Sequence, residues 1–280
     1  MARIYLSDMD GTLLNDNSEL SEFSKNKLND LIKKGVKFTI ATARDFHSMK
    51  HALEGLEINM PVIECNGSYI SDFKTGKKLY INDIKGDIYR IFETLEYLDL
   101  PIIAGVYEDE EDYLYVYGNK DKDSYKTLVS YYEISIGDRM KIVDNIRDLL
   151  NKRIVFIGSY APEQEIVQGY DMLKEKEMSN LHIHYIPGIE KGFYFLNISD
   201  PLSNKGHAVL EYKKMFLEQE DELYCFGDQY NDIEMIENAD TGIAVSNAHN
   251  KLKEIADLVI GTNQQDSVVR YIERNEEECI

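Results

Sequence analysis

Short apolar runs alternate with segments of helical periodicity at both ends of this chain, and the alternation stops in the middle. Residues 4–6, 36–41 and 61–63 are apolar runs, and leucine and isoleucine recur at helical spacing between the first two. The alternation returns from residue 193 onward. Alternating strands and helices are typical of βαβ units, which form a parallel sheet. The sequence therefore predicts an α/β core whose sheet is built from both ends of the chain.

The middle of the chain has a different character, because it is rich in tyrosine and acidic residues. We expect an inserted α+β domain at residues 84–190 and a discontinuous core formed by residues 1–83 and 191–280. Within the insert, the pattern predicts helices over 87–98 and 162–176 and strands over 102–107, 113–117, 154–158 and 181–185. Behind it, strands are predicted over 194–198, 223–226, 241–244 and 258–260.

The charge balance limits the possible partners. The chain has 51 acidic and 31 basic residues, and its formal net charge is −20. Nucleic acids and anionic membranes attract basic surfaces, so we expect neither as a partner. Cys65, Cys225 and Cys279 are odd in number and lack Cys-x-x-Cys spacing, which argues against a disulfide framework and a structural zinc site. Because no signal peptide or membrane-spanning run is evident, we expect a cytoplasmic protein. The sequence does not predict its oligomeric state.

Asp8 and Asp10 follow the first apolar run directly, in the segment Asp-Met-Asp-Gly-Thr. Carboxylates and a glycine turn at a strand end lie where open α/β sheets bind ligands. Residues two apart in an extended segment share a face, so both carboxylates can converge on one small ligand. A solvated turn is the alternative for this motif alone. A calcium loop is excluded, because Leu13 stands where an EF-hand needs glycine.

Three further polar segments follow predicted strands. Thr42 and Arg44 come after the run 36–41, where a hydroxyl and the amides of a helix start can hold phosphate oxygens, and capping of the helix by Thr42 is the alternative. Lys205 precedes a predicted helix and could neutralise a phosphate, and an exposed lysine is the alternative. The segment 227–232 contributes two carboxylates and an amide, from Asp228, Asp232 and Asn231.

In these four segments, taken in this order, the chain resembles the haloacid dehalogenase-like superfamily of phosphotransferases, and within it the Cof-type hydrolases. The family pattern is an aspartate pair with Gly-Thr, a Ser or Thr after the second strand, a lysine, and Gly-Asp-x-x-Asn-Asp. The matching residues are Asp8, Asp10, Thr42, Lys205, Asp228, Asn231 and Asp232. The resemblance implies a Rossmann-like parallel-sheet core with a large α/β cap inserted between Thr42 and Lys205.

The resemblance also implies a phosphatase that acts on a small phosphorylated metabolite, such as a sugar phosphate. Asp8 would be the nucleophile, and the product of its attack would be an aspartyl-phosphate. Asp10 would act first as general acid and then as general base, which requires its pKa to be raised relative to that of Asp8.

The implied ligands of the site include a metal. Mg²⁺ would be held by the Asp8 carboxylate, the Asp10 backbone carbonyl and Asp228. The phosphate oxygens would be bound by Thr42, Lys205 and Asn231, with Arg44 and Asp232 in supporting roles. Asp232 would stabilise either the metal shell or Lys205.

Two other functions stay open at this point. A phosphomutase of the phosphomannomutase type would return the phosphate to a second hydroxyl group, but the insert lacks the clustered arginines that would bind a second phosphate. A non-catalytic regulator that binds a phosphorylated metabolite would be expected to have lost a catalytic group, and none is lost.

Overall fold

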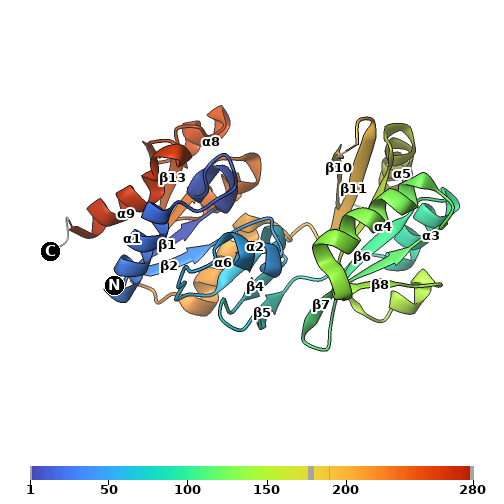
Figure 1. Ribbon diagram of the computed structural model, residues 1–280, viewed down its shortest axis with the longest axis horizontal. Helices are drawn as coiled ribbons and strands as arrows, with labels where there is room; N and C mark the ends of the chain where they lie inside the picture. Colours follow the sequence, from blue (N-terminus) through green and yellow to red (C-terminus); the bar gives the residue numbers. More distant parts are fainter. Residues whose placement is uncertain (1, 176–179, 189, 278–280) are drawn as a thin grey trace. The chain divides into compact units, whose positions relative to one another are not determined.

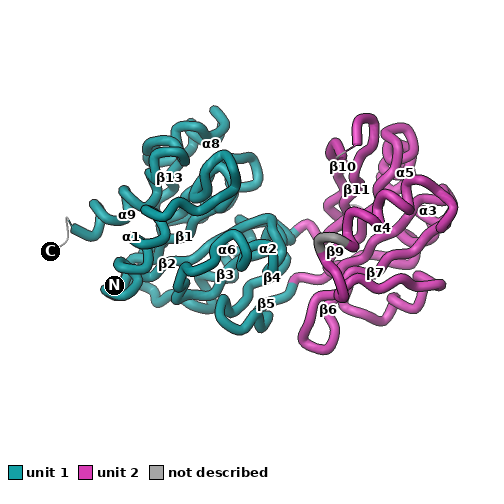
Figure 2. Tube along the Cα trace, in the orientation of Figure 1, with its two compact units in different colours: residues 1–81, 202–280 teal, residues 82–201 magenta. Residues whose placement is uncertain are grey.

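The computed structural model describes residues 2–175, 180–188 and 190–277. The chain divides into two compact units, which have different colours in Figure 2. Residues 1–81 and 202–280 form the core unit, and residues 82–201 form the cap unit. Two features named from the sequence, the helix end at Lys176 and the cysteine at position 279, lie outside the described residues.

The core unit contains a parallel sheet of five strands in the order β14-β13-β12-β1-β2. Figure 1 labels β13, β1 and β2 of this sheet. Its strands are β1 (Arg3–Ser7), β2 (Lys37–Ile40), β12 (Glu222–Gly227), β13 (Thr241–Val245) and β14 (Leu258–Ile260). Its helices are α1 (Glu22–Lys33), α2 (Phe46–Ala52), α6 (Lys205–Phe216), α7 (Ile233–Glu237), α8 (Asn250–Ile255) and α9 (Ser267–Glu277). The predicted α/β core is confirmed.

A small antiparallel sheet extends the core unit beyond β2. It consists of β3 (Val62–Glu64), β4 (Tyr69–Ser71) and β5 (Lys78–Ile81). A parallel bridge between Ala41 and Ile63 joins it to the end of β2. The short helical turn η2 (Cys65–Gly67) connects β3 to β4.

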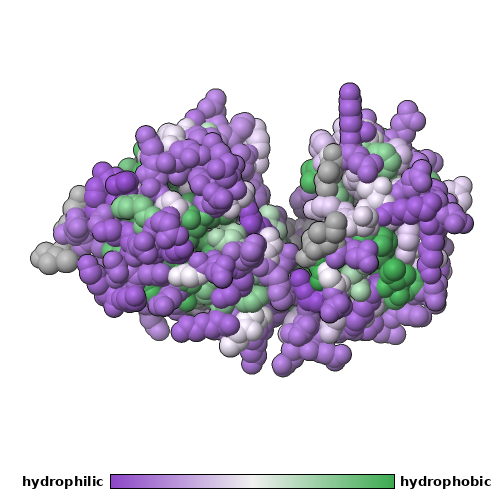
Figure 3. Space-filling model, in the orientation of Figure 1, coloured by the Kyte–Doolittle hydropathy of each residue, from purple (hydrophilic) through white to green (hydrophobic). Residues whose placement is uncertain are grey.

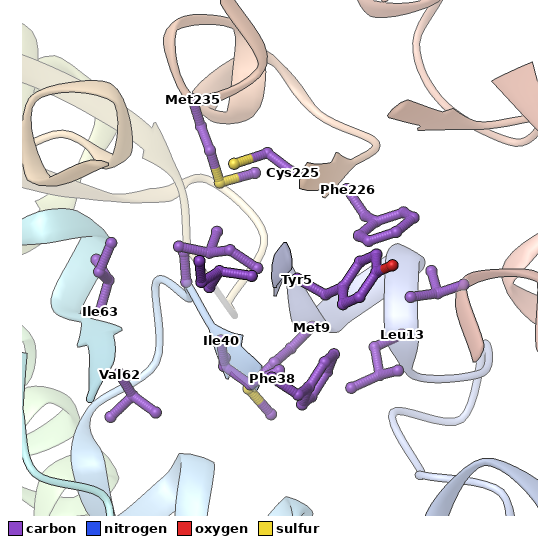
Figure 4. Close-up of a cluster of buried hydrophobic side chains, with 14 of the residues drawn as sticks. Tyr5, Met9, Leu13, Phe38, Ile40, Val62, Ile63, Cys225, Phe226 and Met235 are labelled. Carbon is purple, nitrogen blue, oxygen red and sulfur yellow. The ribbon is translucent and has the colours of Figure 1, made fainter. Parts of the chain in front are cut away.

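The central strands are buried on both faces, as expected for a parallel sheet covered by helices. Successive residues Ile4, Tyr5 and Leu6 of β1 are fully buried. Figure 4 shows Tyr5 near Phe226 of β12, in a cluster that also includes Phe38 of β2. The apolar runs of the sequence therefore form a continuous core behind the carboxyl ends of the strands.

The cap unit contains a sheet of six strands in the order β10-β11-β9-β6-β7-β8, and neighbouring strands are antiparallel except β7 and β8. The strands are β6 (Ile102–Glu108), β7 (Glu111–Tyr117), β8 (Met140–Ile142), β9 (Arg153–Pro162), β10 (His182–Pro187) and β11 (Phe193–Ser199). The helices are α3 (Ile88–Tyr97), α4 (Asp123–Ile136) and α5 (Glu163–Glu175), and α4 was not predicted.

Alternating side chains of the cap sheet enter two separate apolar clusters. Ile102 and Ala104 of β6 pack with residues of α3 and α5, whereas Ile103 packs with residues of α4. This alternation follows from the two-residue repeat of a strand. The cap unit therefore has its own hydrophobic interior on both faces of its sheet.

The predicted second boundary of the insert is wrong. We expected residues 194–198 to begin the returning part of the core, with the boundary between residues 190 and 191. Instead β11 lies between β10 and β9 in the cap sheet and is antiparallel to both, and the units divide between residues 201 and 202. The apolar pattern of 194–198 specifies a buried strand but does not distinguish a parallel partner from an antiparallel one. The first boundary lies between residues 81 and 82, close to the expected position.

Hydrophilic residues cover much of the face of each unit that Figure 3 shows. Among the described residues, no helix is both long and apolar enough to span a membrane.

Candidate active site

The carboxyl ends of β1 and β12 lie side by side at the centre of the core sheet. Ser7 at the end of β1 is paired with Phe226 of β12, and the amide of Asp8 donates to the Phe226 oxygen at 2.9 Å. From these two strands the sheet continues outward in opposite directions, to β2 on one side and to β13 and β14 on the other. Open α/β sheets bind ligands in the crevice at such a reversal of strand order. Asp8 and Asp228 are the first residues after the two strands.

The chain turns sharply after β1, through the helical turn η1 (Met9–Leu13). Gly11 has a φ of +80°, and a Cβ atom at this position would lie 2.4 Å from Oδ2 of Asp228. Glycine is therefore required at position 11 for two reasons: it adopts the positive φ, and it leaves space for the Asp228 carboxylate. The Thr12 hydroxyl donates to Oδ1 of Asp228 at 2.8 Å. The turn after β1 thus holds the carboxylate that follows β12.

Lys205 is buried between two carboxylates. It is the first residue of α6, and the side chain of Asn204 caps this helix by accepting from the amide of His207 at 2.7 Å. The ammonium donates to Oδ1 of Asp8 at 2.5 Å and to Oδ1 of Asp232 at 2.6 Å. Because only 1% of the Lys205 side chain is exposed, the alternative of a surface lysine is wrong.

Asp232 links Lys205 to the loop after β12. Its Oδ1 accepts from Lys205, and its Oδ2 accepts from the amides of Asp228 and Gln229, each at 3.0 Å. Asp232 is fully buried. Both oxygens are thus engaged, so the side chain orients the lysine and fixes the loop that carries Asp228.

The burial of this cluster changes its protonation equilibria. Burial raises the pKa of Asp8 well above its usual range, although the charge of Lys205 opposes the shift. Burial also raises the pKa of Asp228, although the Thr12 hydroxyl lowers it. Burial alone would lower the pKa of Lys205, but the charges of Asp8 and Asp232 outweigh it, so this pKa is raised. Three neighbouring carboxylates, two of which contact the single ammonium of Lys205, favour a further cation.

Asp10 lies in different surroundings. Its two carboxylate oxygens accept from Nε and Nη2 of Arg44 at 2.7 and 2.5 Å, and the Ser18 hydroxyl donates to it at 3.2 Å. The hydrogen bonds from Arg44 lower the pKa of Asp10. The expectation that the pKa of Asp10 exceeds that of Asp8 is therefore wrong for this conformation, because the guanidinium stabilises the ionised form.

Thr42 and Asn231 are linked through residue 66 rather than directly to the carboxylate cluster. The buried Thr42 hydroxyl accepts from the amide of Arg44 at 3.1 Å, as in a capping turn. The Thr42 carbonyl accepts from the amide of Asn66 at 2.9 Å, and the Asn66 side chain accepts from Nδ2 of Asn231 at 3.0 Å.

Some residues of this site received no role from the sequence. These are Thr12, whose hydroxyl reaches Asp228, Ser18, which reaches Asp10, and Asn247, whose Nδ2 donates to the Gly11 carbonyl at 2.7 Å. Thr12 is the last residue of the segment Asp-Met-Asp-Gly-Thr, so the motif itself could have identified it. Ser18 and Asn247 reach the turn through loops whose course has no such local signal.

The comparisons with known proteins agree with this architecture. The family model of haloacid dehalogenase-like hydrolases matches residues 5–272. The chain belongs to the haloacid dehalogenase-like hydrolases. The pyridoxal phosphate phosphatase of Escherichia coli is 24% identical over 96% of this chain and 97% of its own. The 5-amino-6-(5-phospho-D-ribitylamino)uracil phosphatase of Bacillus subtilis is 23% identical over 95% of this chain and 94% of its own.

A solved structure has the same architecture. The crystal structure of a Thermotoga maritima protein is similar with a TM-score of 0.78 and 26% identity, over 98% of this chain and 97% of that protein. The expected superfamily, its fold with an added cap, and the class of phosphatase are thus confirmed.

The carboxylates of this haloacid dehalogenase-like hydrolase can hold a metal ion. Asp8, Asp228 and Asp232 each offer an oxygen, and these atoms lie within 4.8 Å of one another. Both Asp232 oxygens are occupied by Lys205 and backbone amides, so Asp8 and Asp228 are the better ligands. Carboxylate oxygens are the ligands that hard divalent cations prefer. The donor set therefore fits such a cation.

Proposed function

We propose that this protein is a Mg²⁺-dependent phosphatase that hydrolyses a small phosphorylated metabolite, such as a sugar phosphate, through an aspartyl-phosphate on Asp8. The observation that carries the proposal is the buried contact of Asp8 with Lys205, beside Asp228, at the reversal of strand order. A nucleophilic carboxylate needs such a setting, because an anion must approach a phosphate that is also anionic.

The cation and Lys205 would together neutralise the negative charges of Asp8 and of the substrate phosphate. The Asp8 carboxylate, the Asp10 backbone carbonyl and Asp228 would hold Mg²⁺, which when bound neutralises phosphate charge as a Lewis acid. Lys205 would donate to a phosphate oxygen while it orients Asp8. Thr42 and Asn231 would bind further phosphate oxygens.

The reaction would proceed in two displacements at phosphorus. In the first, an Asp8 oxygen forms a bond to phosphorus as the ester P–O bond breaks, and Asp10 gives its proton to the leaving oxygen. In the second, water attacks phosphorus and gives a proton to Asp10, while the bond from phosphorus to Asp8 breaks. Asp10 therefore has to take up a proton before the first step, and its pairing with Arg44 opposes that uptake.

The substrate class is supported by the relatives. Two of them are named as phosphatases of pyridoxal phosphate and of a phosphoribitylamino uracil, which are both small metabolites. A panel of phosphorylated sugars, nucleotides and cofactors, assayed for release of inorganic phosphate, would identify the preferred substrate.

The nucleophile is tested with Asp8→Asn. The purified protein should release phosphate from 4-nitrophenyl phosphate with Mg²⁺ and lose this activity in excess EDTA. Asp8→Asn should reduce kcat by about 10³-fold or more, because an amide is a poor nucleophile. The matched control is Asp30→Asn, which makes the same change at an exposed position of α1.

Two outcomes would contradict the proposal. Asp8→Asn with turnover like that of Asp30→Asn would exclude Asp8 as nucleophile. A protein that moves phosphate between hydroxyl groups of one sugar without releasing it would be a phosphomutase.

A further inference from the structure

The turn η2 between β3 and β4 has an unusual backbone. Three successive residues, Cys65, Asn66 and Gly67, have φ values of 48°, 54° and 96°. Glycine adopts this region at no steric cost and asparagine visits it routinely, whereas a residue such as cysteine loses about 1–2 kcal/mol there. The positive φ of Cys65 therefore persists because surrounding contacts hold it.

The backbone of this turn contacts two segments of the candidate site. The amides of Cys65 and Asn66 donate to the carbonyls of Arg44 and Thr42, each at 2.9 Å. On the other side, a Cβ atom at Gly67 would lie 2.2 Å from the carbonyl oxygen of Asn204. The turn is thus packed between the segment of Thr42 and the residue that precedes Lys205.

The strand before the turn is firmly anchored. Glu64, at the end of β3, accepts from the ammonium of Lys78 at 2.6 Å and from the Ser71 hydroxyl. The exposed fractions of the Glu64 and Lys78 side chains are only 1% and 3%. A buried, hydrogen-bonded ion pair of this kind fixes a segment in one geometry, so the position of the following turn is well defined.

The side chain of Asn66 reaches a third segment. Its Oδ1 accepts from Nδ2 of Asn231 at 3.0 Å, and Asn231 is an exposed residue of the loop between Asp228 and Asp232. An amide group has two N–H donors, so one bond to Asn66 fixes the direction of the other. An exposed asparagine without this bond would rotate freely and would lose entropy on binding a ligand.

We propose that Asn66 is a positioning residue of the phosphate site, which orients the amide of Asn231 toward a phosphate oxygen. The strained turn sets the place of Asn66 relative to Thr42 and the start of α6. The inference rests on the proposed function, because the phosphate contacts of Thr42, Lys205 and Asn231 belong to it.

The test is a double-mutant cycle on phosphate binding. Asn66→Gly removes the side chain but permits the positive φ, and Asn231→Ala removes its partner. Calorimetric titration with inorganic phosphate in the presence of Mg²⁺ gives Kd for the wild type, both single variants and the double variant. Asn66→Gly should raise Kd by about 3–10-fold, the range for one hydrogen bond, and the double variant should match Asn231→Ala alone.

A matched control distinguishes an effect on phosphate binding from the effect of removing any asparagine that links two segments. Asn29 also joins two segments, because it donates to the Gly55 carbonyl at 2.8 Å and accepts from the Glu57 amide at 2.9 Å. Asn29→Ala should leave Kd for phosphate within about 1.5-fold of the wild type, and thermal unfolding shows whether each variant is folded.

The outcomes separate the two proposals. An Asn66→Gly Kd equal to that of the wild type, or single effects that multiply in the double variant, would overturn the positioning role. Phosphate binding with the expected coupling but without turnover of any ester would overturn the phosphatase and support the role of Asn66. A wild type that does not bind phosphate would overturn this inference.

Discussion

Asp8 and Asp10 are separated by one residue, yet their surroundings act on them in opposite directions. Asp8 is buried with Asp228 and Asp232, whereas Asp10 is half-buried and paired with a guanidinium. Burial without enough compensating charge disfavours ionisation, and a forked arginine pair favours it. Stability should therefore respond to these two carboxylates with opposite signs.

Replacing Asp8 should stabilise the metal-free protein. The pKa of Asp8 is raised in the folded state, so wild-type stability falls as pH rises from the unfolded value of about 4 through the folded one. In EDTA at about pH 7, we expect Asp8→Asn to raise the free energy of unfolding, and the gain should shrink toward pH 4. Urea unfolding measures both. A variant less stable than the wild type in EDTA would contradict the effect of burial.

The pairing of Asp10 with Arg44 gives the opposite pH dependence. The pKa of Asp10 is lowered in the folded state, so its contribution is present above about pH 4 and is lost as pH falls through the folded pKa. We expect Arg44→Met to cost about 1 kcal/mol or less near pH 7, because Asp10 is partly exposed, and nothing at the lowest pH. Urea unfolding at a series of pH values checks this, and a cost that persists unchanged in acid would exclude an ionic origin.

The sequence predicts the residue types of the site better than their partners. The pattern after β1 and β12 identifies Asp8 and Asp228, because strand ends of a parallel sheet converge. Lys205 follows β11 of the antiparallel cap sheet instead, and it reaches Asp8 from the start of α6. The expectation that Asp8 and Asp10 act on a shared face assumes that the strand continues, but the chain turns at Met9–Leu13. The partner of Asp10 depends on that turn, which residue spacing does not specify.

At the scale of elements, the turn after β1 depends on one glycine. Gly11→Ala should cost about 1–2 kcal/mol through its positive φ, and it should also displace Asp228, since the new Cβ would meet Oδ2. Gly35→Ala is the matched control, because Gly35 has a φ of +102° but open space around its Cβ position. Both variants should lose stability in calorimetry, but only Gly11→Ala should lose Mg²⁺-dependent phosphate release. Equal activities would show that the close approach is not required.

The cap elements show what periodicity leaves undetermined. The predicted strands and helices near residues 102–117 and 162–175 agree with β6, β7 and α5. β11 was assigned to the wrong unit because its apolar pattern carries no information on which strand it joins. β11 pairs with β10 in a register that places His182 opposite Ser199. This register depends on tertiary contacts, which the local residue pattern does not specify.

At the scale of the whole molecule, the cap unit has the features of an independently folding insert. It contains its own apolar clusters, and near its two ends Asn82 Nδ2 donates to Asp200 Oδ1 at 3.4 Å. Compact units with their own core can fold alone. We therefore expect a fragment of residues 82–201 to unfold cooperatively on heating, as judged by circular dichroism. A non-cooperative, broad transition would show that the cap needs the core unit.

Asp8 and its partner Lys205 are far apart along the chain, and this separation has a consequence for protein synthesis. Lys205 follows Asp8 by 197 residues, with the entire cap between them. At a translation rate of about 5–20 residues per second, the lysine emerges roughly 10–40 s after the aspartate. Throughout that interval a ribosome-bound chain has Asp8 without its ammonium partner, and Asp228 and Asp232 emerge later still, so we expect nascent chains to lack the complete carboxylate cluster until β12 has been synthesised.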